Sequence, residues 1–400
     1  MRYAAITERL RTLGGDKWAV HNAARARRDA GEDILELTIG EPDIAPDSAL
    51  IERCVTSLRA GRTQYSNGRG EPGLVEALVE AYRPRHPQIG PENVLCFPGT
   101  QTALFAVMLG LVGPGEGVLI GDPYYATYEG VVSAAGGHVQ PVPLRMDRDF
   151  VLQPADLRAA ITPESRVLLL NTPHNPTGAV IDRETLEELG TICAEHDLWI
   201  VCDEVYAELI FEGSFTSPLE IAALRERVVV VSSISKSHAA TGFRSGWAIG
   251  PAEFCAALLP VSETMLFGNQ PFIADMTEAA LRGDFDTSTR MREAFGRRAR
   301  MLCARLNAVP GLSAQMPRGG MFLMLDVSGT GLNGDAFAWR LLEEQGVAVM
   351  PGSAFGSNGD GLVRVALTVP DAKLEDAARR VEALSAVLSG RGVAGAAVAQ

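Results

Sequence analysis

A single lysine stands among small hydroxyl side chains in the stretch SISKSHAATGFRSGW, which begins at Ser233. The lysine is Lys236, and an arginine, Arg244, follows it in the same stretch. Residues 228–232 directly before it form a short, β-branched apolar run, which predicts a buried strand. A lysine amine can bond covalently to a carbonyl group, and an arginine can hold an anion. The pattern therefore predicts a reactive loop at the end of a buried strand.

Polar side chains follow other predicted strands in the same way. Between the strand NVLCF and a helical pattern, free backbone N–H groups and the helix dipole favour a phosphate. Other such side chains come after GVLIG, RVLLLN and LWIVC. Because ligands bind beyond the carboxyl ends of the strands in an open α/β sheet, we expect one shared site. The residues concerned are Gly99, Thr100, Gln101, Tyr124, Tyr125, Tyr128, Asn175, Asp203 and Tyr206.

These features together describe a ligand. It has a phosphate, a flat ring on which a tyrosine can stack, and a group that needs the buried anion of Asp203. It also has a carbonyl group that reacts with Lys236. Pyridoxal 5'-phosphate has all four properties. The sequence therefore predicts an enzyme that uses this cofactor.

Apolar runs alternate with helical patterns between about residues 93 and 250. The predicted strands are NVLCF, GVLIG, HVQPVPL, RVLLLN, LWIVCDE, VVVVSS and GWAIG. Such alternation predicts an α/β fold, with a seven-stranded, mostly parallel sheet between two layers of helices.

The pattern changes after about residue 272. A long helical stretch over about 273–308 precedes the runs MFLMLDV, VAVMPG and GLVRVALT, which predicts a smaller α+β unit. The N-terminal segment, with a possible strand at ILELTIG, is expected to join it. We therefore predict a large cofactor-binding domain over 46–285 and a small domain over 1–45 and 286–388. The small-residue tail over 389–400 is expected to be disordered.

Composition and charge exclude several classes of protein. The chain has 400 residues, of which 46% are hydrophobic and 21% charged, as in an ordinary globular protein. The net charge of −13 disfavours nucleic acid and acidic membranes as partners, and no apolar run is long enough to cross a membrane. The start, MRYAAITERLRTL, has a helical pattern and no signal-peptide core.

Short motifs for metals, disulfides and dinucleotides find no support. The six cysteines lack CxxC spacing, which indicates reduced thiols and a cytoplasmic protein. The six histidines form no metal-binding pattern such as HExxH, so we expect no metal site. The motif GRGEPG fits a dinucleotide-binding fingerprint but follows no strand, and we interpret it as a turn.

Four stretches resemble the class I aminotransferases of fold type I. They are SISKSHAATGFRSGW, NTPHNPTG, CDEVY and GLVRVALT, and they occur in that family's order across nearly the whole chain. The resemblance implies that Lys236 forms the Schiff base with the cofactor and that Asp203 pairs with the pyridine nitrogen. It also implies that Asn175 and Tyr206 bind the phenolic oxygen and that Tyr125 stacks on the ring. The implied phosphate-binding set is Gly99, Thr100, Gln101, Ser233 and Arg244, with Ser235 as a lesser candidate.

The same resemblance implies contacts to substrate and to a second subunit. Arg364 in GLVRVAL matches the family arginine that binds the substrate α-carboxylate through two parallel N–H bonds. Gly40 in LTIGEPD matches a position where the backbone lies near the substrate, and Asn175 is expected to contact the substrate as well. Tyr65 matches a tyrosine that reaches the phosphate of a neighbouring subunit. The resemblance thus implies a homodimer with shared active sites.

Within the family, longer stretches such as AEHDLWIVCDEVYAELIF and MLFGN look most like the bacterial arginine–pyruvate transaminases. This likeness suggests a guanidino amino acid as donor, arginine or a cyclic relative, and pyruvate or another small 2-oxo acid as acceptor. A planar cation favours a carboxylate or an aromatic face, for which Asp16, Trp18 and Glu41 are candidates. The stretch MLFGNQPF contains no arginine, which disfavours a dicarboxylate-specific enzyme.

Other functions remain open on the same motifs. An aspartate- or aromatic-type aminotransferase, a β-lyase or an oxidase would use the same Lys236 and Asp203. A transcription regulator with an aminotransferase-like domain would need a DNA-binding module, for which the segment before ILELTIG is too short. His174 and His238 lie beside the motifs, and we assign neither a chemical role.

Overall fold

The computed structural model describes residues 2–388 except 12, 14 and 267, so the predicted tail over 389–400 lies outside the described residues. A seven-stranded sheet has the order β2-β8-β7-β6-β5-β3-β4. β8 runs antiparallel to both neighbours, and the other neighbours pair in parallel. All seven predicted strands are present, and the mostly parallel sheet is confirmed. The strands are β2 (Val94–Phe97), β3 (Gly117–Asp122), β4 (His138–Pro143), β5 (Ser165–Asn171), β6 (Trp199–Asp203), β7 (Val228–Ser233) and β8 (Gly246–Ile249).

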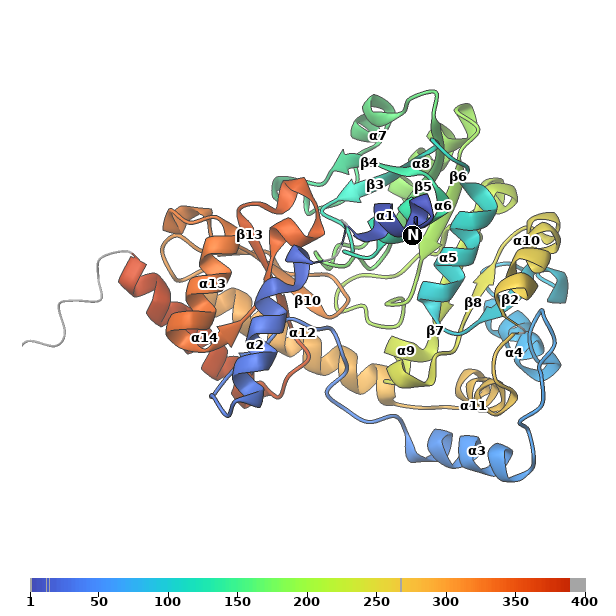
Figure 1. Cartoon of the computed structure of the whole chain (residues 1–400), viewed down its shortest axis with the longest axis horizontal. Helices are drawn as coiled ribbons and strands as arrows, with labels where there is room; N and C mark the ends of the chain where they lie inside the picture. The colour runs from blue at the N-terminus through green and yellow to red at the C-terminus, as the bar shows by residue number, and fades with distance from the viewer. Residues whose placement is uncertain (1, 12, 14, 267, 389–400) are drawn as a thin grey trace, which may run out of the picture.

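The central strands are buried on both faces because alternate side chains enter two apolar clusters. In β6, Ile200 and Cys202 join one cluster and Val201 joins the other. The first cluster is covered by α4 (Pro72–Tyr82), α8 (Arg183–Glu195) and α11 (Pro271–Arg282). The second is covered by α5 (Thr100–Leu111), α6 (Tyr128–Ala135) and α10 (Ala252–Met265). The sheet therefore lies between two helical layers (Figure 1).

A second, smaller unit is α+β. Its four-stranded sheet has the order β12-β13-β10-β9, and its core is shared with α2 (Ala19–Asp29), α12 (Thr287–Leu306), α13 (Gly334–Gln345) and α14 (Asp371–Leu388). β1 (Leu35–Glu36) pairs in parallel with β11 (Val347–Ala348), so the N-terminal segment joins this unit, as expected (Figure 1). The domain boundaries stay a prediction. The strands are β9 (Ser313–Ala314), β10 (Phe322–Asp326), β12 (Met350–Pro351) and β13 (Leu362–Ala366).

Two expectations about elements are wrong in detail. The long helical stretch is two helices, because α11 ends at Arg282 and Gly283 is extended before α12 begins at Thr287. Glycine has a low helix propensity and often ends a helix. The possible strand at ILELTIG shortens to β1. The Leu37 backbone still binds Ala348 and Ala366, but the next three carbonyl oxygens, of residues 38–40, accept from side chains instead of from a neighbouring strand.

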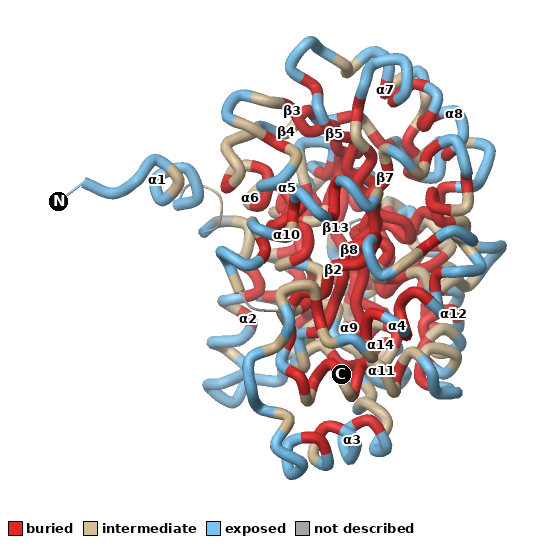
Figure 2. Tube along the Cα trace, turned by 90° about the vertical axis from the view of Figure 1, so that its right-hand side faces the viewer, coloured by how far each residue is buried: buried red, intermediate tan, exposed pale blue. Residues whose placement is uncertain are grey.

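The predicted N-terminal helix is α1 (Ala5–Arg11), which has no buried residue and extends from the body of the molecule (Figure 2). Its Arg9 donates a hydrogen bond to the carbonyl oxygen of Ser133 at 3.1 Å. Over the part of the chain that the structure describes, no helix is both long enough and apolar enough to cross a membrane.

Candidate active site

A cavity of about 240 Å³ lies at the carboxyl edge of the large sheet and is closed on one side by the small unit. β5, β6 and β7 end side by side there, because Asn171 is in register with Asp203, which is in register with Val231. The residues predicted from the sequence that line the cavity are Trp18, Gly40, Thr100, Gln101, Tyr125, Tyr128, Asn175, Asp203, Tyr206, Ser233, Ser235, Lys236, Arg244 and Arg364. Gly99 lies against Arg244 at the same edge. Tyr65 lies elsewhere, and its side chain is 91% exposed.

Lys236 is held just beyond the end of β7, an inner strand of the large sheet. The short helix α9 (Ile234–Ser237) begins directly after this strand, and the Ser233 hydroxyl caps it by accepting from the Ser235 N–H at 3.3 Å. The Lys236 Nζ points into the cavity and donates to the Gly40 carbonyl oxygen at 2.7 Å. The pKa of Lys236 is lowered to about 8, chiefly by burial and in smaller part by the neighbouring Arg244. A larger share of this amine is therefore uncharged near neutral pH than in an exposed lysine.

Asp203, the last residue of β6, is a buried carboxylate that faces the same cavity. Its Oδ2 accepts from the Tyr128 hydroxyl at 2.9 Å, and its Oδ1 accepts from the Val205 N–H at 3.1 Å. Burial raises the pKa of Asp203 to about 6, although both hydrogen bonds act in the opposite direction. A buried acid of this kind is stabilised by a cation placed beside it.

Arg364, at the centre of β13, is also buried. Its guanidinium carbon lies 4.0 Å from the ring centre of Phe322 and 4.4 Å from that of Phe355. Nη2 donates to the Thr38 carbonyl oxygen at 2.6 Å, and Nη1 donates to Asn175 Oδ1 at 2.9 Å. Nε is buried without a partner among the described residues. Burial lowers the pKa of Arg364 to about 10, which means that its buried positive charge is disfavoured without a counter-ion. Because N–H groups also remain available, the site favours an anionic ligand.

Backbone and side-chain donors at another end of the cavity suit a phosphate. Gly99 precedes α5 with φ +86, and a β-carbon there would collide with the Arg244 guanidinium. A β-carbon on Gly246 would lie 2.7 Å from the backbone of Gly99, so glycine lets β8 approach the start of α5. The Thr100 hydroxyl is buried there with no hydrogen-bond partner among the described residues. Unpaired donors at a helix N-terminus beside an arginine are a typical phosphate site.

Residues 32–381 match the family model of class I and II aminotransferases. The chain belongs to this family. It is 41% identical to the arginine–pyruvate transaminase AruH of Pseudomonas aeruginosa, over 98% of this chain and 100% of that protein. It is 35% identical to the aspartate/prephenate aminotransferase of Thermus thermophilus, over 90% and 94% of the two chains. The solved aspartate aminotransferase of Thermus thermophilus with maleate has a TM-score of 0.89 and 34% identity, over 96% of this chain and 99% of that one.

The aminotransferase uses pyridoxal phosphate, as its family does. The residues present fit this cofactor, because the cavity joins the three groups that the cofactor requires. The unpaired Thr100 hydroxyl and the start of α5 suit its phosphate, Asp203 suits its ring nitrogen, and Lys236 suits its aldehyde.

The structure adds site residues that we did not single out from the sequence. Asn171 joins two predicted residues, since its Oδ1 accepts from the Asn175 N–H at 2.7 Å and its Nδ2 donates to the Asp203 carbonyl oxygen at 2.9 Å. It ends β5, so the rule of polar residues at strand ends could have found it. Tyr128, expected from the sequence at this edge as one of three tyrosines that could stack on a ring, instead binds the Asp203 carboxylate. Nothing local in the sequence marks Thr38, Phe322 or Phe355 as partners of Arg364.

Of the three residues predicted to bind the substrate side chain, two lie at or near the cavity, and the side chain of the third is outside the described part of the structure. Trp18 lines the cavity. Glu41 Oε1 accepts from the Thr241 hydroxyl at 3.0 Å, and this acid raises the pKa of Lys236 against the stronger effect of burial. Asp16 begins the short helix η1 (Asp16–Trp18), and its side chain lies outside the described part of the structure.

The two histidines beside the motifs do not line the cavity. His174 Nδ1 lies 2.8 Å from the Thr177 hydroxyl, and burial lowers the pKa of His174 to about 3. His238 Nδ1 lies 2.8 Å from the Ser237 hydroxyl, and its ring packs edge-on against Phe285. Both act as packed, hydrogen-bonded side chains.

Proposed function

We propose that this aminotransferase takes the amino group from an L-amino acid with a guanidino side chain and gives it to a small 2-oxo acid such as pyruvate. The observation that carries the proposal is the 41% identity to an arginine–pyruvate transaminase over the full length of both chains. The residues that line the cavity also support it.

The chemistry divides among the residues around the cavity. Pyridoxal phosphate, when bound, supplies an electron sink for negative charge at the substrate Cα. We assign Lys236 Nζ as the covalent attachment point and as the group that moves a proton at the substrate Cα. Its lowered pKa supports both tasks, because each needs an uncharged amine. Asp203 is assigned to the ring nitrogen, where its buried anion favours a positive charge.

The remaining assignments follow from position in the cavity. We assign Asn175 and Tyr206 to the phenolic oxygen and Tyr125 to the ring face. Arg364 is assigned to the substrate carboxylate, with the Gly40 backbone and Asn175 beside it. Donor and acceptor both carry that carboxylate, so one arginine serves both half-reactions. The phosphate set is Gly99, Thr100, Gln101, Ser233 and Arg244.

The charges around the cavity support a cationic side chain on the donor. Lys236, Arg244 and Arg364 already have assigned tasks, and they are the only cations among the described residues that line the cavity. A dicarboxylate donor would need another. Trp18 offers an aromatic face and Glu41 a carboxylate, the two groups that stabilise a guanidinium.

Single-turnover absorbance of the bound cofactor tests the donor directly. L-arginine, L-aspartate, L-alanine and L-phenylalanine are compared, and we expect arginine to react more efficiently than the others by about tenfold or more, or 1.4 kcal/mol. An advantage of that size for aspartate or phenylalanine would overturn the guanidino donor and leave the family unchanged. Formation of a lyase or oxidase product instead of the amine form of the cofactor would overturn transamination itself.

The variant Glu41→Gln is the matched control for the side-chain assignment. It keeps the size of the side chain and removes the charge, so it should slow arginine and leave alanine nearly unchanged. Equal losses with both donors would show that Glu41 acts on Lys236 instead of on the substrate side chain.

We also propose that the enzyme is a homodimer in which Tyr65 reaches the neighbouring subunit's phosphate site. Tyr65 is 91% exposed, and large apolar side chains are exposed on α3 (Ser48–Arg59) and at the end of α10. These are Ile51, Leu58 and Met265. Exposed apolar groups of this kind favour an interface.

We place the enzyme in the cytoplasm. All six cysteines are free thiols, and five of them are buried. Unpaired cysteines in a chain of this length are typical of a reducing compartment.

A further inference from the structure

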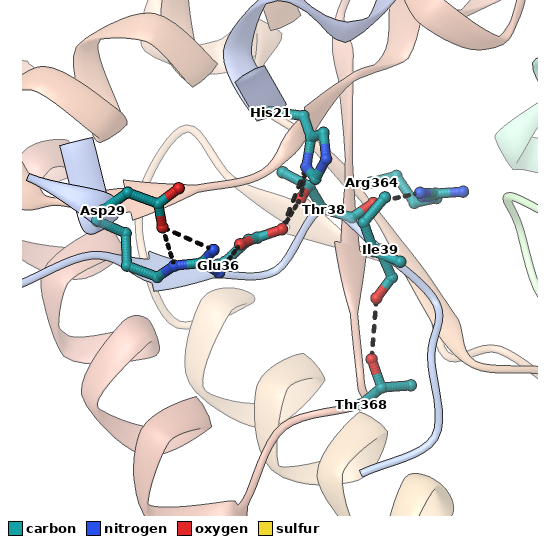
Figure 3. Close-up of polar contacts among 8 residues, drawn as sticks. His21, Asp29, Glu36, Thr38, Ile39, Arg364 and Thr368 are labelled. Carbon is teal, nitrogen blue, oxygen red and sulfur yellow. Dashed lines mark hydrogen bonds and ion pairs between the residues drawn. The ribbon is translucent and has the colours of Figure 1, made fainter. Parts of the chain in front are cut away.

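Three consecutive backbone carbonyls after β1 bind three side chains, and two of these, Arg364 and Lys236, line the active-site cavity. The Thr38 oxygen accepts from Arg364 Nη2 at 2.6 Å, and the Ile39 oxygen accepts from the Thr368 hydroxyl at 3.0 Å (Figure 3). The Gly40 oxygen accepts from Lys236 Nζ at 2.7 Å. We call residues 38–40 the carbonyl strap. Its position sets the orientation of the arginine assigned to the substrate carboxylate.

The strap is anchored through the Thr38 side chain, which is fully buried. Its hydroxyl faces His21 from α2 and Glu36 from β1 (Figure 3). His21 Nδ1 lies 2.7 Å from Thr38 Oγ1 and 3.2 Å from Glu36 Oε1. The Thr38 hydroxyl donates to that same Glu36 oxygen at 3.2 Å. We assign His21 Nδ1 as the donor to Thr38 Oγ1, because the hydroxyl gives its one proton to Glu36 and a protonated Nδ1 also suits the carboxylate oxygen 3.2 Å away.

The His21 ring is held firmly in this position. It is 7% exposed, and Trp18 packs on it edge-to-face with ring centres 5.8 Å apart. The charged groups that act on it are Glu36, Arg25 and Arg28, and Arg28 Nη1 in turn binds Glu36 Oε2 at 2.7 Å. Burial lowers the pKa of His21. We assign the proton of the neutral ring to Nδ1, because this nitrogen faces the two oxygens of Thr38 and Glu36. The hydrogen bond to Thr38 therefore does not depend on the charge of His21.

The guanidinium of Arg364 has little freedom to change its orientation. Two aromatic rings, Phe322 and Phe355, fix the plane of its guanidinium. Rotation within that plane is limited by the Thr38 carbonyl on Nη2 and by Asn175 on Nη1. If Thr38 shifts, the guanidinium of Arg364 rotates, and its remaining N–H groups no longer point at the ligand.

We propose that His21 is a positioning residue for substrate carboxylate binding, which acts through Thr38 on Arg364. The proposal rests on the assigned role of Arg364. Lys236 has a covalent partner in the loaded enzyme and no longer depends on the Gly40 contact. The effect of His21 therefore falls on carboxylate affinity and not on the proton transfer.

The test uses the holoenzyme and propionate, a carboxylate without an amino group, whose Kd is measured by competition with pyruvate. For His21→Ala we expect the propionate Kd and the KM of pyruvate to rise about tenfold, with kcat within about twofold. His21→Asn should keep near wild-type values, because its Nδ2 lies as many bonds from Cβ as the histidine Nδ1 does. Thr38→Val should match His21→Ala, and the double variant should be no weaker than either single one.

Controls separate a positioning role from a loss of fold and from the role of Arg364. Thermal unfolding checks each variant, and Thr38→Val decides the question if His21→Ala does not fold. An unchanged propionate Kd in folded Thr38→Val or His21→Ala, or an equal loss in His21→Asn, overturns the proposal. So does a fall in kcat without a rise in KM. If Arg364→Ala leaves the Kd unchanged, the assigned role of Arg364 is wrong as well.

Discussion

Burial has opposite effects on the two ionisable groups that face each other across the cavity. It raises the pKa of Asp203 to about 6 and lowers the pKa of Lys236 to about 8. Each shift disfavours the charged form of its group. The acid thus gains from a cation supplied by the cofactor ring, and a larger share of the amine can accept a proton near neutral pH than in an exposed lysine.

The first residue-scale prediction concerns Asp203→Asn. The fold should survive, because the Tyr128 hydroxyl can still donate to the amide oxygen. The half-reaction rate with L-alanine should fall by roughly 10²–10³-fold, since the buried charge that favours a protonated ring is gone. Single-turnover absorbance and thermal unfolding measure the two effects. Tyr128→Phe, which keeps the carboxylate, is the control and should lose less; a near-normal rate in Asp203→Asn would mean that the ring works unprotonated.

At the scale of elements, the strand ends were the predictable part of the site. Buried parallel strands read as continuous apolar runs, and polar residues directly after them gather at one edge. Asp203, Asn175 and Lys236 follow from that rule and from family resemblance. The partners of Arg364 could not be predicted, because Thr38 and Phe322 come from segments far apart in sequence and no local period reports their pairing. The break between α11 and α12 was missed as well, because a single glycine, Gly283, is a weaker sequence signal than the apolar run of a buried strand.

The end of β6 serves both faces of the sheet, because successive side chains of a strand point in opposite directions. Asp203 faces the cavity, and the next residue, Glu204, is 1% exposed on the other side. Its Oε1 accepts from the Ser217 hydroxyl at 2.5 Å, while Oε2 is buried without a partner among the described residues. Burial raises the pKa of Glu204 to about 7, partly offset by Arg85.

Glu204 should therefore make stability fall with pH. Its pKa in the folded protein, about 7, lies above the ordinary value of 4.5, so its contribution is full below 4.5 and is lost as pH rises through 7. Between about pH 5 and about pH 8, the wild type should lose roughly 2–3 kcal/mol of unfolding free energy relative to Glu204→Gln. Denaturant unfolding of the holoenzyme at several pH values measures this. Glu208→Gln, at a side chain that is 56% exposed, is the control; parallel curves for wild type and Glu204→Gln would refute the prediction.

At the scale of the whole molecule, the active site is assembled from distant parts of the chain. The large sheet supplies Asp203 and Lys236, and the small unit supplies Arg364. A buried arginine on α12, Arg298, holds the segment that follows the carbonyl strap to the small unit. Its guanidinium binds Asp43 at 2.8 Å and Asp371 at 2.6 Å. Ligand binding between the large sheet and the small unit should therefore depend on contacts such as those of Arg298, which lie away from the reacting groups.

The proposed homodimer extends this assembly to a second subunit and gives the last prediction. Tyr65 is 91% exposed and does not line the cavity of its own subunit, which is why we propose that it reaches a phosphate across an interface. Mixed dimers of Tyr65→Phe and Lys236→Ala subunits, selected by two different tags, test this. If sites are shared, one site contains both changes and the other neither, so half of the sites should bind cofactor with wild-type affinity. If Tyr65 serves its own subunit, no site is intact, and the best affinity should fall about tenfold for the lost hydroxyl. A chain that stays monomeric and active would exclude sharing altogether.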